Sequence, residues 1–294
     1  MALHILGILF PVFACVVLGY IIGRCLKPDM QTVNKINFDA FLPCLVFASL
    51  STMPLNTAKI PLIVAVIIAI IVPGVLMWLA CKPLSVSYKE WVPPQMFRNS
   101  GNLAIPLFGF TFGDSALEAA VLIFVISSAI HIITAPLVLH GNFKASLKEL
   151  AKMPVMIAAV AALTINLTGF PLWQPIHEAA KLMGNASVPI MLVSLGVQLT
   201  STNRKSIPVG LSASFISLIT GALAFIIIYL AVPLTTRELQ MMVIYCMLPP
   251  AVMNYLYAEK YSVAPFNVAA MVLVGNFISI FTLPLLLLFA FSLG

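Results

Sequence analysis

The sequence predicts an all-α integral membrane protein with ten transmembrane helices, arranged as two five-helix units in an inverted repeat. Three observations predict this fold: the composition, the number of apolar runs, and short motifs that recur about half a chain apart. Of the 294 residues, 62% are hydrophobic and 8% are charged, against roughly 45–50% and about 25% in soluble domains. A span takes about 20 residues and a short loop roughly 8 to 10 more, so about ten spans fill the chain and leave no room for a soluble catalytic domain.

The apolar runs predict the helices in chain order. Their ranges are 4–23, 33–50, 60–81, 91–113, 115–139, 154–170, 176–199, 208–232, 237–257 and 264–291. The first run lacks a positively charged start and a cleavage signature, so we expect a span rather than a signal peptide. The second, fourth, seventh and ninth runs are the least uniform, because they contain polar residues, Gly and Pro.

The basic residues predict the orientation of these helices. Eleven Lys and Arg residues lie in the loops after helices 1, 3, 5, 7 and 9, and three lie on the opposite side (Lys59, Lys181 and Arg237). The positive-inside rule therefore places the loops after the odd-numbered helices in the cytoplasm and both termini outside it.

The charge distribution argues against a nucleic-acid partner, and the cysteine pattern argues against a bound metal or cofactor. The net charge of +6 comes from scattered Lys and Arg residues that form no basic face, so we expect no nucleic-acid partner. The five cysteines show neither CxxC spacing nor nearby histidine clusters. We interpret them as buried apolar side chains and expect no metal site and no cofactor.

Two short motifs recur in the second half of the chain. The sequence Thr-Ala-Pro-Leu at 134–137 is matched by Thr-Leu-Pro-Leu at 282–285, and Ala-Phe-Leu-Pro at 40–43 is matched by Ala-Ser-Val-Pro at 186–189. Both pairs lie in corresponding helices, which predicts two units, 1–147 and 148–294. Because each unit has five helices, the second enters the membrane from the opposite side, as in many secondary transporters.

The centre of the fourth predicted helix is unusually polar. It contains a cation, two amides, a hydroxyl, a glycine and a proline, which are Arg98, Asn99, Ser100, Gly101, Asn102 and Pro106. Pro106 lacks an N–H and Gly101 weakens the helix before it, so we expect a break near the middle of the membrane. The alternative is a kinked packing helix whose polar side chains bond to neighbouring helices.

The ninth predicted helix has a matching interruption. Pro249 and Pro250 are consecutive near its centre, and Asn254 follows. Interrupted helices in corresponding positions of two repeats indicate a transporter binding site. The N-terminal ends of the half-helices would suit a carboxylate, and the freed carbonyls would suit a cation.

Four intramembrane positions have more than one interpretation. Arg98 either attracts an anion or extends its charge to the interface. Asp39 in the second helix is a candidate ion or proton site, but it could instead pair with Arg98 or lie at the interface. Asn254 and Asn276 either bind substrate or form interhelical hydrogen bonds.

The motif Arg98-Asn99-Ser100-Gly101-Asn102 with Pro106, together with the proline-bearing ninth helix, resembles the auxin efflux carrier family of transporters. The resemblance covers all ten helices. It implies a fold similar to the bile-acid sodium symporters, in which helices 4 and 9 cross and a mobile domain slides past a dimeric scaffold of helices 1, 2, 6 and 7. It also implies that Asn99, Asn102, Pro106 and the Pro249-Pro250 pair line the substrate site.

The chain departs from relatives of this family in two ways. The connection 141–153 is short, which is similar to prokaryotic members and implies a bacterial inner (plasma) membrane protein. The ninth helix lacks the acidic residue that helps to bind sodium in the bile-acid relatives, which weakens the case for sodium coupling.

From these features we expect a non-enzymatic secondary transporter, a homodimer in the bilayer, that moves a small organic anion such as a mono- or dicarboxylate. The expected mechanism is elevator-type alternating access, coupled to a proton or sodium gradient. Alternatives are a sodium-coupled organic-anion symporter and a ligand-binding membrane sensor. An intramembrane hydrolase using Ser100 or Ser127 with His131 is disfavoured, because no acid follows to orient the histidine.

Overall fold

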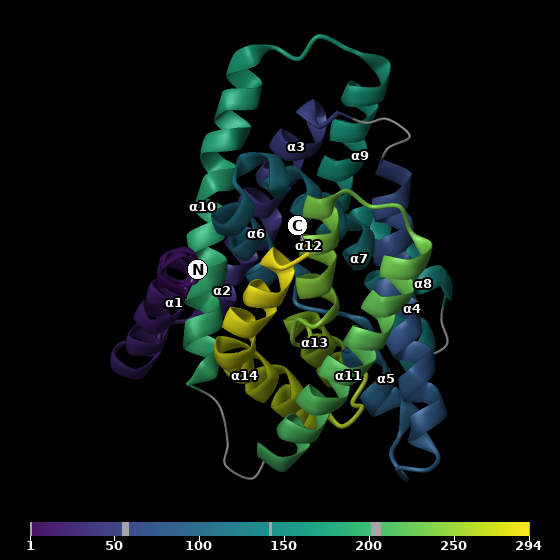
Figure 1. The fold of residues 1–294 in the computed structure, drawn as a ribbon. Helices are drawn as coiled ribbons and strands as arrows, with labels where there is room; N and C mark the ends of the chain where they lie inside the picture. Colours follow the sequence, from purple (N-terminus) through teal and green to yellow (C-terminus); the bar gives the residue numbers. More distant parts are fainter. Residues whose placement is uncertain (1, 55–58, 141–142, 201–206, 294) are drawn as a thin grey trace.

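The computed structural model describes residues 2–54, 59–140, 143–200 and 207–293, and the part of the chain that it describes folds into helices without β-strands (Figure 1). The helices and π-helical turns follow one another in this order: α1 Ala2–Cys25, α2 Met30–Ile36, η1 Asn37–Phe41, α3 Leu42–Thr52, α4 Ile60–Cys81, α5 Tyr88–Met96, η3 Ser100–Ala104, α6 Ile105–Phe112, α7 Asp114–His140, α8 Phe143–Lys152, α9 Pro154–Thr168, α10 Gln174–Leu199, α11 Ile207–Ala231, α12 Thr236–Cys246, α13 Val252–Lys260 and α14 Pro265–Phe291.

The predicted helical segments are confirmed, with ends that differ from the predicted ones by up to three residues. In the described ranges, seven helices are long and apolar enough to cross a membrane, the second of them formed by α2, η1 and α3 together. A shorter apolar helix, α9, corresponds to the sixth predicted segment. The fourth and ninth segments are interrupted, so neither contains a continuous helix of spanning length.

The connection between α7 and α9 contains a helix that the sequence analysis did not predict. Helix α8 covers Phe143–Lys152, and Glu149 on it accepts a hydrogen bond from Lys260 at the end of α13, with 2.9 Å between Nζ and Oε2. Its charged residues gave no apolar run, which is why hydropathy alone assigned this stretch to a loop.

The start of α2 shows how local sequence fixes a helix end. Asp29 caps α2, because its carboxylate accepts hydrogen bonds from the Thr32 hydroxyl at 2.6 Å and from the Gln31 N–H at 3.0 Å. These bonds stabilise the charged carboxylate and therefore lower the pKa of Asp29. The cap separates α2 from α1 and begins the second span.

The helices pack in two groups. The first group contains α1, α2, η1, α3, α9 and α10, which pack most closely on one another. The second group contains the remaining spanning elements: α4, α5, η3, α6, α7 and α11 to α14. In Figure 1, α1 and α10 of the first group lie on the left, and α4, α5 and α11 of the second lie on the right.

Glycines allow the closest contacts inside each group. A Cβ on Gly196 of α10 would overlap the Val16 carbonyl of α1, and a Cβ on Gly221 of α11 would overlap the carbonyl of Cys246, the last residue of α12. Such approaches bring helix backbones together and increase van der Waals contact in a membrane. Among the described glycines, backbone overlaps of this kind lie within one group or the other, not between them.

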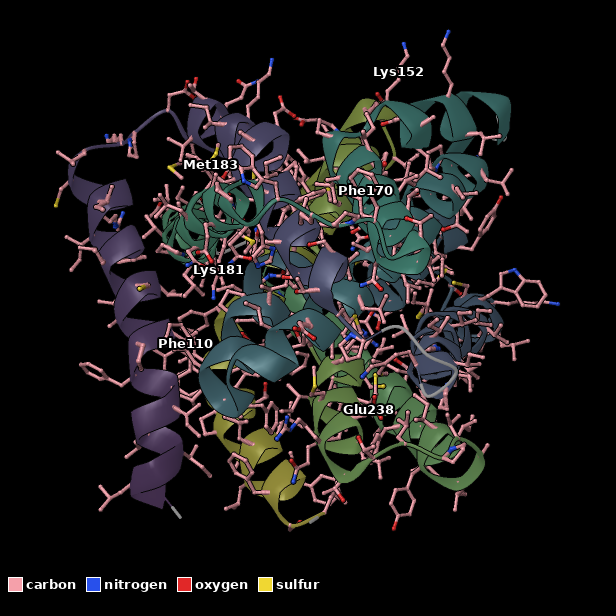
Figure 2. The ribbon with its side chains drawn as sticks, turned by 90° about the horizontal axis from the view of Figure 1, so that it is seen from above. Phe110, Lys152, Phe170, Lys181, Met183 and Glu238 are labelled. Carbon is pink, nitrogen blue, oxygen red and sulfur yellow. The ribbon has the colours of Figure 1, made fainter. Side chains whose placement is uncertain are left out.

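Large apolar side chains remain on the outside of the molecule. Figure 2 places α1 along one edge, with side chains directed away from the other helices. Leu3, Phe10 and Val17 of this helix are 86%, 73% and 56% exposed. An exposed apolar surface of this extent fits a protein whose solvent is lipid.

Candidate functional site

The two interrupted helices meet at their breaks. Residues 97–99 are extended between α5 and η3, and residues 249–251 are extended between α12 and α13. The N–H of Asn99 donates to the Pro249 carbonyl at 2.8 Å, and the N–H of Ala251 donates to the Phe97 carbonyl at 2.9 Å. These two bonds form a short antiparallel bridge in which Arg98 lies opposite Pro250. We refer to residues 97–99 and 249–251 together as the crossing.

The prolines fit this bridge for a geometric reason. Arg98 and Pro250 form the pair whose backbone nitrogens point away from the partner segment, because the bonds run through the residues on either side. The missing N–H of Pro250 therefore costs no bond across the bridge. The two extended segments form hydrogen bonds with each other through their backbones. Neither segment alone could satisfy its backbone N–H and C=O groups inside a membrane.

Three of the predicted amides hold the crossing together. The amide of Asn99 donates to the side-chain oxygen of Asn276 in α14 at 2.8 Å. Asn276 in turn donates to Val272 at 2.8 Å and to Pro250 at 3.5 Å. Asn254 donates to the carbonyls of Phe97 and Ala251, each at 3.0 Å. The structure brings these side chains together, and their amide N–H groups are already bonded within the protein.

Arg98 is completely buried at the crossing. Its guanidinium donates to the Leu248 carbonyl at 3.4 Å, to the Ser217 carbonyl at 3.3 Å and to the Thr220 hydroxyl at 3.5 Å. Its Nε has no partner in the described part of the chain. The contacts of Arg98 are thus long and neutral, so its positive charge is not cancelled locally.

The remaining predicted residues of the fourth span lie on η3 and α6. The N–H of Ala104 donates to the Asn99 carbonyl at 3.1 Å, which gives the wider π-helical turn. Pro106 follows as the second residue of α6, and the Cβ position of Gly101 faces the Phe124 ring at 3.1 Å. The side chains of Ser100 and Asn102 are buried, 5% and 9% exposed, and neither has a hydrogen-bond partner among the described residues.

Element η3 lies at the boundary between the two groups. It packs against α7 of the second group and against α10 of the first group. The two unbonded polar side chains, Ser100 and Asn102, therefore lie on an element that contacts the opposite group. By contrast, Asp39 is exposed on η1 and forms no ion pair with Arg98.

His131 belongs to the packing around the crossing. Its ring stacks on Phe97, with 3.9 Å between ring centroids and 7° between the planes, and lies 5.3 Å from the Tyr257 ring. The ring thus supports the extended segment from the α7 side.

Small cavities flank the crossing. One is lined by Ser217, Leu248, Pro249 and Gly275, and another by Pro94, His131, Asn254 and Tyr257; each has a volume of about 10 Å³. This is at or below the volume that one water molecule needs. In this arrangement the crossing is closely packed on both sides.

Three buried residues near the crossing were not among the predicted site residues: Gln95, Ser217 and Thr220. Gln95 is buried and donates to the Ala213 carbonyl at 3.2 Å, and the other two accept hydrogen bonds from Arg98. A signal was present, because small residues recur at helical spacing on the face of α11 that packs inward: Gly210, Ser214, Ser217 and Gly221. Such a stripe marks close helix packing, but it does not identify the partner.

Comparison with known proteins places the chain in a class of carriers. A family model described as membrane transport protein matches residues 139–287, about half of the chain. The chain therefore belongs to this family of membrane transporters, the auxin efflux carriers, as the motif at 98–102 predicted. The matched region includes Pro249, Pro250, Asn254 and Asn276.

Named relatives are bacterial. The chain is 25% identical over 284 residues to the uncharacterized transporter YfdV of Escherichia coli (strain K12), and the match covers 88% of each chain. The YfdV proteins of Escherichia coli O157:H7 and Shigella flexneri match with the same identity and coverage. The prediction of a multi-span membrane transporter is confirmed, and membership of a transporter family implies a non-enzyme.

Proposed function

We propose that this transporter is a secondary active carrier that moves a small organic anion, such as a mono- or dicarboxylate, by alternating access. The observation that carries the proposal is the crossing, where two broken helices support each other beside the unbonded side chains of Ser100 and Asn102. Broken helices place backbone groups and polar side chains where a substrate can use them within the membrane.

In this proposal the site residues divide into two roles. Ser100 and Asn102 bind the substrate, and the N-terminal end of the helical segment from η3 through α6 offers N–H groups to its carboxylate. Asn99, Asn254 and Asn276 hold the two breaks in register, as their hydrogen bonds indicate. Gly101, Pro106, Pro249 and Pro250 shape the breaks.

Arg98 provides the positive potential that favours an anion. It touches only neutral oxygen atoms among the described residues, and a buried charge without a counter-ion acts over a longer range than a paired one. An anionic substrate near η3 would supply the missing negative charge.

We further propose that residues 1–147 and 148–294 form an inverted repeat, with both termini outside the cytoplasm of a bacterial inner membrane. The two interruptions support this, since they lie about half a chain apart and pair in antiparallel fashion. The distribution of Lys and Arg supports the orientation. The exposed apolar surface of α1 suits lipid or the second copy of a homodimer.

The proposed motion is an elevator movement of the second group past the first. Glycine-mediated backbone contacts tie helices together inside each group, as at Gly196 and Gly221. Among the described glycines, no such backbone contact joins the two groups. Sliding at the boundary between the groups would therefore disturb packing least. Substrate bound at η3 would travel with the second group.

The driving ion is proposed to be a proton, with Asp39 as the candidate carrier. Asp39 is exposed on η1 of the first group, and an acidic side chain within a span is a candidate proton carrier. Uptake of a radiolabelled monocarboxylate into vesicles should respond to an imposed pH gradient, and Asp39→Asn should remove that response. A response to a sodium gradient instead would favour the sodium-coupled alternative.

The decisive experiment is counterflow of labelled carboxylates in proteoliposomes containing the Asn102→Ala variant. We expect counterflow by wild type and at least about a tenfold loss in the variant, since a polar group that binds only the substrate is removed. Asn267→Ala is the matched control, because the Asn267 amide bonds to Glu90 away from the crossing. Wild-type counterflow by Asn102→Ala would contradict the site assignment.

A further inference from the structure

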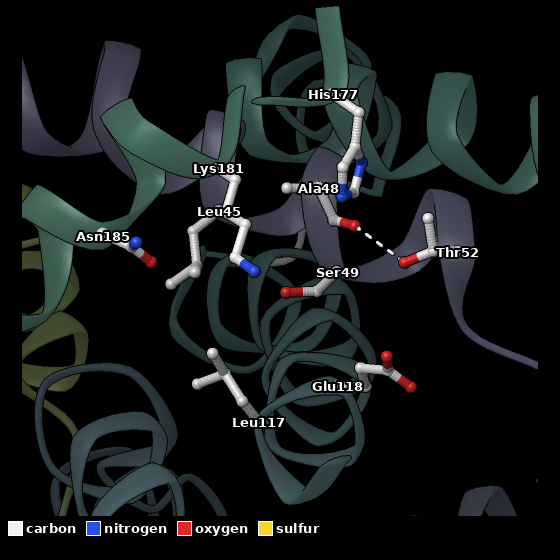
Figure 3. A pocket seen from close by; sticks show the side chains of 9 residues that line it. All are labelled: Leu45, Ala48, Ser49, Thr52, Leu117, Glu118, His177, Lys181 and Asn185. Atoms are coloured by element: carbon white, nitrogen blue, oxygen red, sulfur yellow. Dashed lines mark hydrogen bonds between the residues drawn. The ribbon is translucent and has the colours of Figure 1, made fainter. Parts of the chain in front are cut away.

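A polar cleft lies between α3 and α10 of the first group and α7 of the second (Figure 3). Its volume is about 190 Å³, far larger than the cavities at the crossing. Nine residues line it: Leu45, Ala48, Ser49, Thr52, Leu117, Glu118, His177, Lys181 and Asn185. Six of these side chains are polar, which is unusual for helices that otherwise face lipid or apolar neighbours. We call it the α3–α7–α10 cleft.

One wall of the cleft is a polar stripe along α10. Gln174, Glu178, Lys181 and Asn185 recur at spacings of four, three and four residues, so they share one helix face, and His177 lies beside them. At 1.5 Å per residue the stripe extends about 16 Å into the span. The stripe begins at the N-terminal end of α10 and brings polar side chains towards the level of η3, which also packs on α10.

The charged groups of the cleft are not matched to one another. Among the described residues, Lys181 and Glu118 face the same cavity without forming an ion pair with each other. The Nδ1 atom of His177 is buried and has no hydrogen-bond partner in the ranges that the structure describes. In Figure 3 the Lys181 ammonium and the Ser49 hydroxyl point towards the centre of the cleft, with Glu118 across from them.

The geometry points to a second ligand site in the α3–α7–α10 cleft, which binds a small carboxylate that also carries a hydroxyl or amino donor. The carboxylate would pair with Lys181 and accept from Ser49, while the donor would reach Glu118. The volume corresponds to about six water molecules in the liquid, so it admits a ligand of a few carbons. Binding to both α7 and α10 would bridge the two groups.

Lactate, propionate and lactamide are suitable probes, because propionate lacks the hydroxyl and lactamide lacks the charge. Binding would be followed by the rise in melting temperature of the purified protein, which increases with ligand affinity. The Asn102→Ala variant should serve as background, so that binding at the crossing does not contribute. We expect lactate to raise the melting temperature of this variant more than propionate does, and lactamide to have no effect.

The second arm removes the charges one at a time. Lys181→Gln should weaken lactate binding about tenfold or more, since a charge-assisted hydrogen bond is lost. Glu118→Gln should reduce the difference between the melting-temperature rises caused by lactate and by propionate. Lys152→Gln is the matched control, because Lys152 is exposed and extends away from the molecule (Figure 2). Unchanged lactate binding by Lys181→Gln, or no lactate effect on the background protein, would overturn the inference. Loss of transport in Asn102→Ala with lactate binding retained separates this site from the proposed transport site.

Discussion

At the scale of single residues, Arg98 combines complete burial with weak contacts. Its three hydrogen bonds measure 3.3 to 3.5 Å, longer than the usual 2.7–2.9 Å of charge-assisted bonds. Taking a guanidinium out of water costs several kcal/mol, and long bonds to neutral oxygens offset only part of this. Under the proposed function, we expect Arg98 to contribute more to substrate binding than to stability.

We therefore predict that Arg98→Met separates binding from stability. Loss of the hydrogen bonds and relief of the buried charge oppose each other, so the melting temperature should change by less than about 4 °C. The KM for a carboxylate in proteoliposomes should rise about tenfold or more, because unit charges about 8 Å apart at an effective dielectric constant of about 20 attract by about 2 kcal/mol.

Arg98→Lys is the informative comparison for this prediction. It retains the positive charge but not the planar group that reaches Leu248, Ser217 and Thr220. Its KM should stay closer to wild type than that of Arg98→Met. Equal KM values for wild type and Arg98→Met would show that Arg98 is structural.

At the scale of elements, glycine contacts decide how tightly α1 and α10 pack. A Cβ on Gly196 would overlap the Val16 carbonyl and lie 2.9 Å from Gly19 Cα, and backbone atoms cannot rotate away. Gly7 in the same helix as Val16 has no atom within 4 Å of its Cβ position. The two positions therefore form a matched pair for one substitution.

Gly196→Ala should destabilise the first group by about 1–3 kcal/mol, the usual cost of overpacking. Gly7→Ala should be neutral or stabilise by up to about 1 kcal/mol, because alanine favours the helical backbone. Thermal unfolding in detergent followed by circular dichroism measures both. The prediction would be refuted if the two variants had the same melting temperature.

The positions of the helix breaks show what the sequence could and could not predict. The Pro249-Pro250 pair predicted the break in the ninth span, and it lies there. In the fourth span Gly101 and Pro106 predicted a break near the middle of the membrane, and the extended backbone lies at 97–99, shortly before Gly101. The π-helical turn η3 accommodates Pro106 within the helix, and the extended backbone forms where a partner segment is available. That choice depends on a contact about 150 residues away.

The side-chain hydrogen bonds of the crossing could not be predicted from the sequence, because they too depend on contacts between distant segments. The sequence identified Asn99, Asn254 and Asn276 as amides that need partners, and the structure places them on one hydrogen-bonded network. Which amide bonds to which carbonyl depends on how α14 packs against the breaks. Hydropathy contains no information on this, because it describes each span alone.

At the scale of the whole molecule, hydropathy predicted the helical segments but not their division into two groups. The division follows from which helices can approach closely, and the α3–α7–α10 cleft follows from where the groups meet. The polar stripe of α10 is visible in the sequence as Gln174, Glu178, Lys181 and Asn185, at spacings of four, three and four residues. Only the fold shows that α3 and α7 complete a cavity around it.

The proposed sliding motion predicts that a covalent link between the groups stops transport. Thr52 on α3 and Glu118 on α7 line the same cleft from opposite groups. In a protein whose five native cysteines are replaced, Thr52→Cys with Glu118→Cys should lose counterflow when treated with a bifunctional thiol reagent. Activity should return when a reducible linker is cleaved.

A pair within one group provides the control for this experiment. His177 lies on α10, in the same group as Thr52, and lines the same cleft. Thr52→Cys with His177→Cys should therefore link with the same reagent and keep its counterflow, because both residues stay together as the second group moves. If both linked pairs lose activity equally, the link acts by blocking the cleft rather than by stopping the sliding. If both remain active, the two groups do not slide at this boundary, and substrate must reach η3 by a smaller local opening.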